Sequence, residues 1–100
     1  MNTREVAAGD RTFTLRAESP RTSLSEGDTT LWGFNVEVLD GGHPICIKTC
    51  FVGRVSVQAR APEALKGTAA DIAVVVHGFA FDKVVESLAK GDYEDGIVFA

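Results

Sequence analysis

The longest regular pattern in this sequence is a two-residue alternation that runs without a slip from residue 45 to residue 60. One set of alternate positions holds Ile45, Ile47, Thr49, Phe51, Gly53, Val55, Val57 and Ala59, and the other holds Cys46, Lys48, Cys50, Val52, Arg54, Ser56, Gln58 and Arg60. This period is typical of a β-strand with one buried face. A straight strand of this length would span about 53 Å at ~3.3 Å per residue, which is too long for a domain whose radius of gyration is near ~13 Å. We therefore predict a bend, bulge or turn at Gly53.

Two further strands are predicted before this segment. Residues 11–18 and 30–39 both alternate, which places on one face of each strand the residues Phe13, Leu15 and Ala17, and Trp32, Phe34, Val36 and Val38, respectively. The polar stretch 21–28 predicts a loop. The residues Asp40-Gly41-Gly42 predict a tight hairpin, because glycine readily adopts the positive φ angles that such turns need.

The last third of the chain allows two interpretations. Pro62 predicts a short helix through Lys66 that Gly67 ends. Residues 69–90 could form one helix opened by a capping box, but their apolar residues change sides halfway along such a helix. The favoured prediction is therefore a buried strand over 72–77 and a helix over 81–90 that Gly91 terminates. A short final strand is predicted over 97–99.

These elements predict one α+β domain over residues 1–100, with a mostly antiparallel sheet of four to six strands and one main C-terminal helix packed on one face. The longest apolar run, residues 72–76, is far shorter than the ~20 residues that a membrane span needs. The polar residues 1–5 are unlike a secretory signal, so the expected location is the cytoplasm. Reduced cysteines are expected there.

The alternation also predicts which residues lie on the face of the sheet away from its core. Lys48, Arg54 and Arg60 are expected to form an outward row that pairs with Glu37 or contacts an anionic partner. The same outer face would carry the apolar residues Leu31, Leu39 and Val52. An uncovered apolar face of this kind favours association with another chain.

Cysteine and histidine are the residues that could carry chemistry. If residues 45–51 are extended, the Cβ atoms of Cys46 and Cys50 lie ~13 Å apart, too far for a disulfide. A zinc site would have to recruit His43, Cys46, Cys50 and His77, but their spacing matches no common zinc motif. His77 is interpreted as a hydrogen-bonded, partly buried residue. We therefore expect no metal and no cofactor.

Negative charge is concentrated at the C-terminal end. The net charge is −4, and residues 61–100 carry three lysines against seven acidic residues, which accounts for the whole excess. This disfavours a nucleic-acid surface there, because such surfaces need clustered Lys and Arg. We predict instead that a protein partner binds a surface containing the five acidic residues Asp82, Glu86, Asp92, Glu94 and Asp95.

Three functions remain open. The favoured hypothesis is a small non-enzymatic binding protein, such as an inhibitor, immunity or accessory factor, that acts through an acidic C-terminal surface. The first alternative is a small metal- or thiol-dependent enzyme that uses Cys46 and Cys50 with His43 and His77. The second alternative is a structural homo-oligomer. An enzyme is disfavoured because the sequence contains no phosphate loop, nucleophile elbow or dinucleotide fingerprint.

Overall fold

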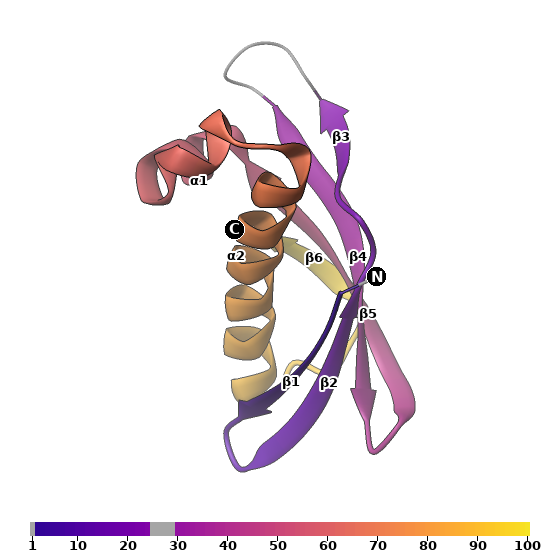
Figure 1. Cartoon of the computed structure of the whole chain (residues 1–100). Helices are drawn as coiled ribbons and strands as arrows, with labels where there is room; N and C mark the ends of the chain where they lie inside the picture. The colour runs from indigo at the N-terminus through magenta and orange to yellow at the C-terminus, as the bar shows by residue number, and fades with distance from the viewer. Residues whose placement is uncertain (1, 25–29) are drawn as a thin grey trace.

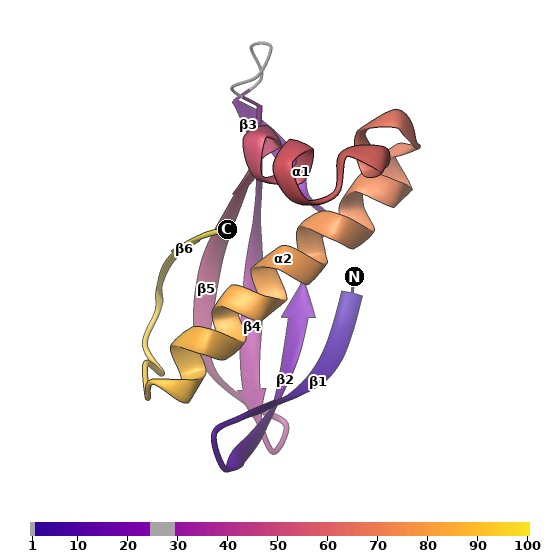
Figure 2. The same cartoon turned by 90° about the vertical axis from the view of Figure 1, so that its left-hand side faces the viewer.

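The computed structural model describes residues 2–24 and 30–100 of the chain. Six strands and three helical segments follow in the order β1 (Asn2–Ala8), β2 (Arg11–Ala17), β3 (Arg21–Leu24), β4 (Leu31–Asp40), β5 (His43–Gly53), α1 (Arg54–Arg60), the 3-10 helix η2 (Pro62–Lys66), α2 (Ala69–Ala89) and β6 (Gly96–Phe99). The long helix α2 lies across one face of a single curved sheet (Figures 1 and 2), and no helix of the described residues covers the other face. The predicted α+β class is confirmed.

The sheet is antiparallel except at its last strand. Its order is β1-β2-β4-β5-β6, with β3 paired to β4 beside this path, and β6 runs parallel to β5. The predicted hairpin joins β4 to β5, and Gly41 and Gly42 both have positive φ angles, +58° and +84°. Strand β3 occupies residues for which a loop was predicted, and the rest of that predicted loop extends beyond the described residues.

Strands β2 and β4 supply much of the core, as their alternation predicts. Phe13, Leu15 and Ala17 of β2 are buried, as are Phe34, Val36 and Val38 of β4, while Trp32 is half-buried. These side chains pack with Val76, Ala80, Phe81, Val84 and Leu88 of α2. The core therefore lies between α2 and the helix-covered face of the sheet.

The predicted orientation of β5 is wrong. Cys46, Lys48, Cys50 and Val52 are buried, while Ile45 and Ile47 are exposed. Pairing with β4 explains this, because Lys48 lies opposite Val36 and Cys50 lies opposite Phe34, and residues opposite each other in a sheet share a face. Leu39 is also buried rather than on the outer face, beside an irregularity in the pairing between Val38 and Leu39.

Gly53 ends β5, as a turn there would require, but the chain continues as the helix α1 and not as a second strand. Arg54 and Arg60 therefore do not form a row with Lys48. Val57 is the buried residue of this short helix, and the alternation over residues 54–60 has no counterpart in a sheet. The predicted helix Pro62–Lys66 is present as η2, with Gly67 as its C-cap.

Residues 69–89 form one continuous helix, so the favoured division into a strand and a helix is wrong. The capping box is present, since the Thr68 side chain accepts a hydrogen bond from Asp71 N and Asp71 accepts one from Thr68 N. The change of apolar side has a structural cause: η2 packs against α2, and the Arg60 guanidinium lies 3.6 Å from the centre of the Phe79 ring. A second, partial cover therefore shields Phe79 on a side of α2 other than the one that faces the sheet.

The second half of α2 agrees with the sequence pattern. Phe81, Val84 and Leu88 are buried against the sheet, and Asp82 and Glu86 are exposed. Gly91, with a φ angle of +84°, follows the end of the helix. Among the described residues, no helix combines the length and the apolar character needed to span a membrane.

Replacing Leu88 by alanine should lower the free energy of unfolding by about 2 to 5 kcal/mol, because the substitution leaves a cavity between α2 and the sheet. Asp82→Ala on the exposed side of the same helix is the matched control and should change it by less than about 0.5 kcal/mol. Urea unfolding of the three proteins measures both values. Equal stability of wild type and Leu88→Ala would contradict the packing described.

Candidate functional site

The cysteine and histidine residues do not gather into one cluster in the described part of the chain. Cys46 and Cys50 are unbridged and lie on the helix-covered face of β5, while His43 is exposed at the start of that strand. His77 lies in the middle of α2. Within residues 2–24 and 30–100, no three His, Cys, Asp or Glu side chains lie close enough together to hold a metal ion.

Both thiols are in surroundings that oppose ionisation. Burial raises the pKa of Cys50 to about 12, although the nearby Lys48 acts in the opposite direction. Burial also raises the pKa of Cys46, again against the effect of Lys48. Because the thiolate is the nucleophilic form of cysteine, these two residues are poor nucleophiles in the folded protein.

His77 has a structural role, as its position predicted. Its Nε2 atom lies 2.8 Å from the carbonyl oxygen of Glu18, which can only accept, so Nε2 carries the proton. Its Nδ1 atom accepts from the side-chain amide of Asn2 at 3.2 Å. The ring packs between Phe34 and Phe81, at centroid distances of 5.0 and 6.0 Å. Both ring nitrogens are thus used to tie α2 to the N-terminal part of the sheet.

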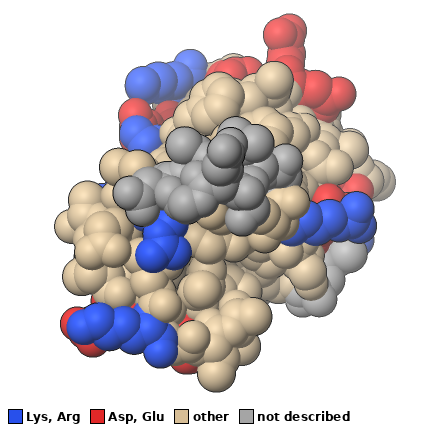
Figure 3. Space-filling view, turned by 90° about the horizontal axis from the view of Figure 1, so that it is seen from above, with Lys and Arg blue, Asp and Glu red and all other residues tan. Residues whose placement is uncertain are grey.

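The acidic residues predicted as a binding surface differ in their surroundings. Asp82 and Glu86 lie on the exposed side of α2, and Glu86 forms ion pairs with Lys83 at 3.7 Å and Lys90 at 3.6 Å. Asp92, Glu94 and Asp95 lie in the turn between α2 and β6. Several of these charges are therefore partly offset by neighbouring groups. Positive and negative side chains also lie close together at the end of the molecule that is seen from above in Figure 3.

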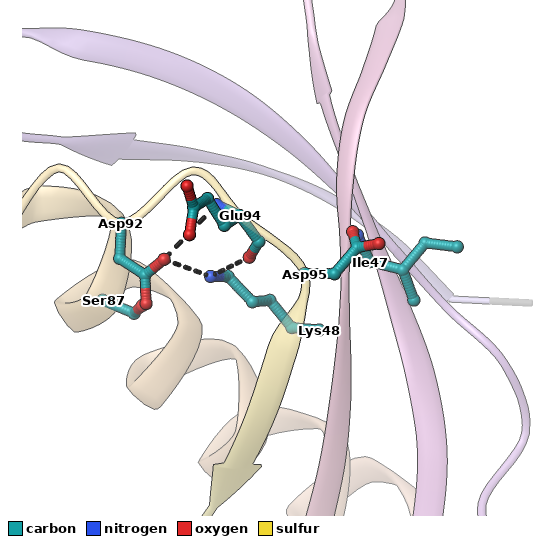
Figure 4. A network of polar contacts seen from close by, with 6 residues as sticks. All are labelled: Ile47, Lys48, Ser87, Asp92, Glu94 and Asp95. Atoms are coloured by element: carbon teal, nitrogen blue, oxygen red, sulfur yellow. Dashed lines mark hydrogen bonds and ion pairs between the residues drawn. The ribbon is translucent and has the colours of Figure 1, made fainter.

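A buried lysine organises the turn that carries the last three acids. The Lys48 side chain is only 1% exposed, and its Nζ atom lies 3.1 Å from Asp92 Oδ1 and donates to the Glu94 carbonyl oxygen at 2.6 Å (Figure 4). Asp92 also accepts from Ser87 Oγ and from Glu94 N. These contacts, led by the one with Lys48, lower the pKa of Asp92. Sequence reasoning missed this network because it placed Lys48 on the outer face.

A second contact ties the same turn to β5. The backbone N–H of Ile47 donates to Asp95 Oδ1 at 2.7 Å, just before the point where β6 begins to pair with β5 (Figure 4). Asp95 therefore continues the hydrogen bonding of the β5 edge beyond the end of β6. The result is that the acidic turn and the final strand are held in a fixed position beside β5.

The outer face of the sheet, away from α2, carries an apolar surface at this edge. We call it the open-face patch and define it as Ile45, Ile47 and Phe51 of β5 with Ile97 and Phe99 of β6. Phe51 pairs with Phe99 in neighbouring strands, so their side chains lie on the same face of the sheet. The two rings stack with their centroids 5.6 Å apart. Ile97 and Phe99 are 66% and 70% exposed, and Ile47 is 44% exposed.

Polar groups bound the open-face patch on its other side. On the neighbouring strands, Arg16 pairs with Glu37 at 3.2 Å, and Thr49 Oγ1 donates to Asn35 Oδ1 at 2.9 Å. Glu37 lies opposite Ile47 in the pairing of β4 with β5. It is therefore Arg16, and not Lys48, that pairs with Glu37. The outer face thus divides into a polar half over β2 and β4 and an apolar half over β5 and β6.

Comparisons of the chain with protein-family models, with curated proteins and with solved structures found no match.

Under native conditions without reductant, both thiols should react slowly with a thiol reagent, because they are buried and their pKa values are raised. After denaturation, two thiols per chain should react at once. Spectrophotometric thiol titration measures both rates. Fast labelling of either cysteine in the folded protein would contradict the burial described, and fewer than two thiols after denaturation would indicate a disulfide.

Loss of the Asp92 charge should destabilise the fold, because it leaves the buried Lys48 ammonium without its counter-charge. The pKa of Asp92 is lowered by folding, so its contribution is present above the unfolded pKa of about 3.9 and is lost as the pH falls through the lower folded pKa. The stability difference between wild type and Asp92→Asn should therefore be largest at neutral pH and shrink in acid.

A second variant separates the buried charge from the shape of the site. Lys48→Met combined with Asp92→Asn should be more stable than Asp92→Asn alone, because no unpaired charge remains inside. Thermal unfolding across pH values from about 2 to about 7 measures these differences. An Asp92→Asn variant as stable as wild type at neutral pH would show that this ion pair does not stabilise the fold.

Proposed function

We propose that this protein is a non-enzymatic binding protein that holds a protein partner on the open-face patch. The single observation that carries the proposal is the exposure of Ile47, Ile97 and Phe99 together on a sheet face that none of the described helices covers (Figure 1). Ile45 extends the patch along β5. Exposed fractions of this size leave roughly 400 Å² of apolar surface, because a large apolar side chain contributes about 150 to 250 Å² when fully exposed. A contiguous patch of that size on a monomer is often functional.

Other exposed apolar residues support the choice of this surface by contrast. Val55 on α1 and Val74 on α2 are also exposed, but each is a single residue outside the patch. Scattered apolar residues of that kind are common on protein surfaces and need no partner. The open-face patch differs because five apolar residues from two adjacent strands meet.

The enzyme alternative has less support. A nucleophilic cysteine needs a low pKa and access to a substrate, whereas Cys46 and Cys50 are buried and their pKa values are raised. His77 would have to give up the hydrogen bond that its Nδ1 atom accepts from Asn2 to act as a base. The surroundings of Cys46, Cys50 and His77 therefore favour a structural role over a catalytic one.

Part of the predicted acidic surface, the turn that carries Glu94 and Asp95, fits the same proposal as a rim. Asp95 contacts Ile47 and so borders the open-face patch directly, and Glu94 precedes it. Asp82 and Glu86 lie farther away on α2. We propose that these acidic residues attract a partner with basic groups around an apolar centre, while the open-face patch supplies most of the affinity.

The double substitution Ile47→Thr and Ile97→Thr should weaken partner binding by at least about tenfold, because it removes two apolar side chains and keeps residues that suit strands. Val74→Thr is the matched control: it removes an apolar residue that is 71% exposed, more than Ile47 or Ile97, from the exposed side of α2. Immobilised wild type and both variants are used to capture proteins from the native host. A protein held equally by all three would contradict the proposal, and so would the absence of any protein held by wild type and Val74→Thr but lost by the double variant.

The captured partner also tests the acidic rim. Asp82→Lys, Glu86→Lys and Glu94→Lys together should slow association and reduce its dependence on salt, with little change in dissociation. Surface plasmon resonance at several salt concentrations measures both rates. Unchanged association in a folded variant would remove the acidic residues from the proposal and leave the open-face patch as the binding surface.

A further inference from the structure

Strand β6 forms one edge of the sheet, and its outer backbone groups face away from β5. The N–H of Ala100 donates to the Phe51 carbonyl oxygen at 2.9 Å, so the backbone groups of Ala100 and Val98 point toward β5. Backbone direction alternates along a strand, and therefore the N–H and C=O groups of Ile97 and Phe99 point outward. No hydrogen bond from these outward groups is found within the described part of the chain.

The composition of β6 does not protect this edge. Its sequence Gly-Ile-Val-Phe contains no charge and no proline, which are the residues that usually prevent edge strands from pairing with other chains. The opposite edge of the sheet, β1, carries Arg4 and Glu5, both exposed. The two edges therefore differ, and the unprotected one is β6.

We infer that a second copy of this chain pairs with β6 in antiparallel orientation, so that the two sheets join edge to edge. A twofold axis at Val98 brings Ile97 opposite Phe99 of the second copy, and Phe99 opposite Ile97. These are the residues with outward N–H and C=O groups, so each pair exchanges two backbone hydrogen bonds. The strand is thus complementary to itself, and each isoleucine lies beside an aromatic ring, a favourable cross-strand pair.

Charge favours the same arrangement. The acidic turn at residues 92–95 precedes β6, whereas α1, which carries Arg54 and Arg60 and no acidic residue, lies at the other end of β6. The hydrogen bond from Ser56 Oγ to the Ala100 carbonyl oxygen fixes α1 in that position. Antiparallel pairing therefore directs the acidic turn of each copy toward the basic helix of the other.

The dimer extends the surface proposed above. Ile97 and Phe99 remain on the outer face after their backbones pair, so the two open-face patches meet at the twofold axis and form one continuous apolar band. This inference goes beyond the proposed function, because the pairing depends only on β6 and not on any partner.

Sedimentation velocity of the purified protein over a wide concentration series tests the inference. Wild type and Val74→Thr should shift with concentration from 10.7 kDa toward about 21 kDa, twice the mass of one chain. Ile97→Pro should stay monomeric, because it removes an outward N–H and no hydrogen bond to β5. Phe99→Lys, which keeps the backbone and adds an edge charge, should also stay monomeric.

A cysteine scan tests the register. Val98 and Val98 of the second copy face each other as a non-hydrogen-bonded pair with Cα atoms about 4.5 Å apart. Because Cys50 lies opposite Val98 in the pairing of β5 with β6, the scan is made in a Cys50→Ala background, where Val98→Cys should form an intermolecular disulfide under mild oxidation. Ile97→Cys and Phe99→Cys, which are not opposite themselves, should cross-link far less. A wild type that is monomeric throughout, a folded Ile97→Pro that still dimerises, or equal cross-linking at the three positions would overturn the inference. A monomer that still captures its partner would leave the proposed function standing.

Discussion

The position of the last strand depends on one buried ion pair. Lys48 is almost completely buried among apolar residues of β5, and such a charge is tolerated only if hydrogen-bonding and charged groups come to it. Asp92 and the Glu94 carbonyl oxygen supply those groups, and both belong to the turn that leads into β6. The ion pair therefore fixes where β6 begins, and with it the open-face patch and the free edge of the sheet.

The division of the sheet into two unlike faces follows from the pairing of β4 with β5. Val36 belongs to the core, and Lys48 lies opposite it, so the charged residue must face the helix while Ile47 faces outward. A one-residue change of register would exchange these two sets. The arrangement thus keeps a lysine inside and isoleucines outside, which is the reverse of the usual preference.

Much of the fold could be predicted from the sequence where the pattern was local. The alternation in β2 and β4, the glycines after β4 and the buried side of the second half of α2 are all as predicted. The orientation of β5 could not be predicted, because both of its faces carry apolar residues and only the partner strand decides between them. The single helix α2 was missed because its first half is apolar on a side that η2 and Arg60 cover, and that contact lies outside the helix. The acidic residues were predicted as a binding surface, but the contacts of Asp92 and Glu94 with Lys48 could not be predicted, because they form only in the tertiary structure.

The parallel strand β6 also affects how the chain reaches its folded state. Strands β1 to β5 can pair as soon as residues 2–53 are available. Residues 92–99 are needed before Lys48 has a counter-charge and before β5 has a neighbouring strand at the edge away from β4. Until then a growing chain presents both an uncovered apolar strand edge and a lysine that opposes burial. Contacts across more than forty residues form slowly compared with hairpins, so docking of β6 is expected to be a late step.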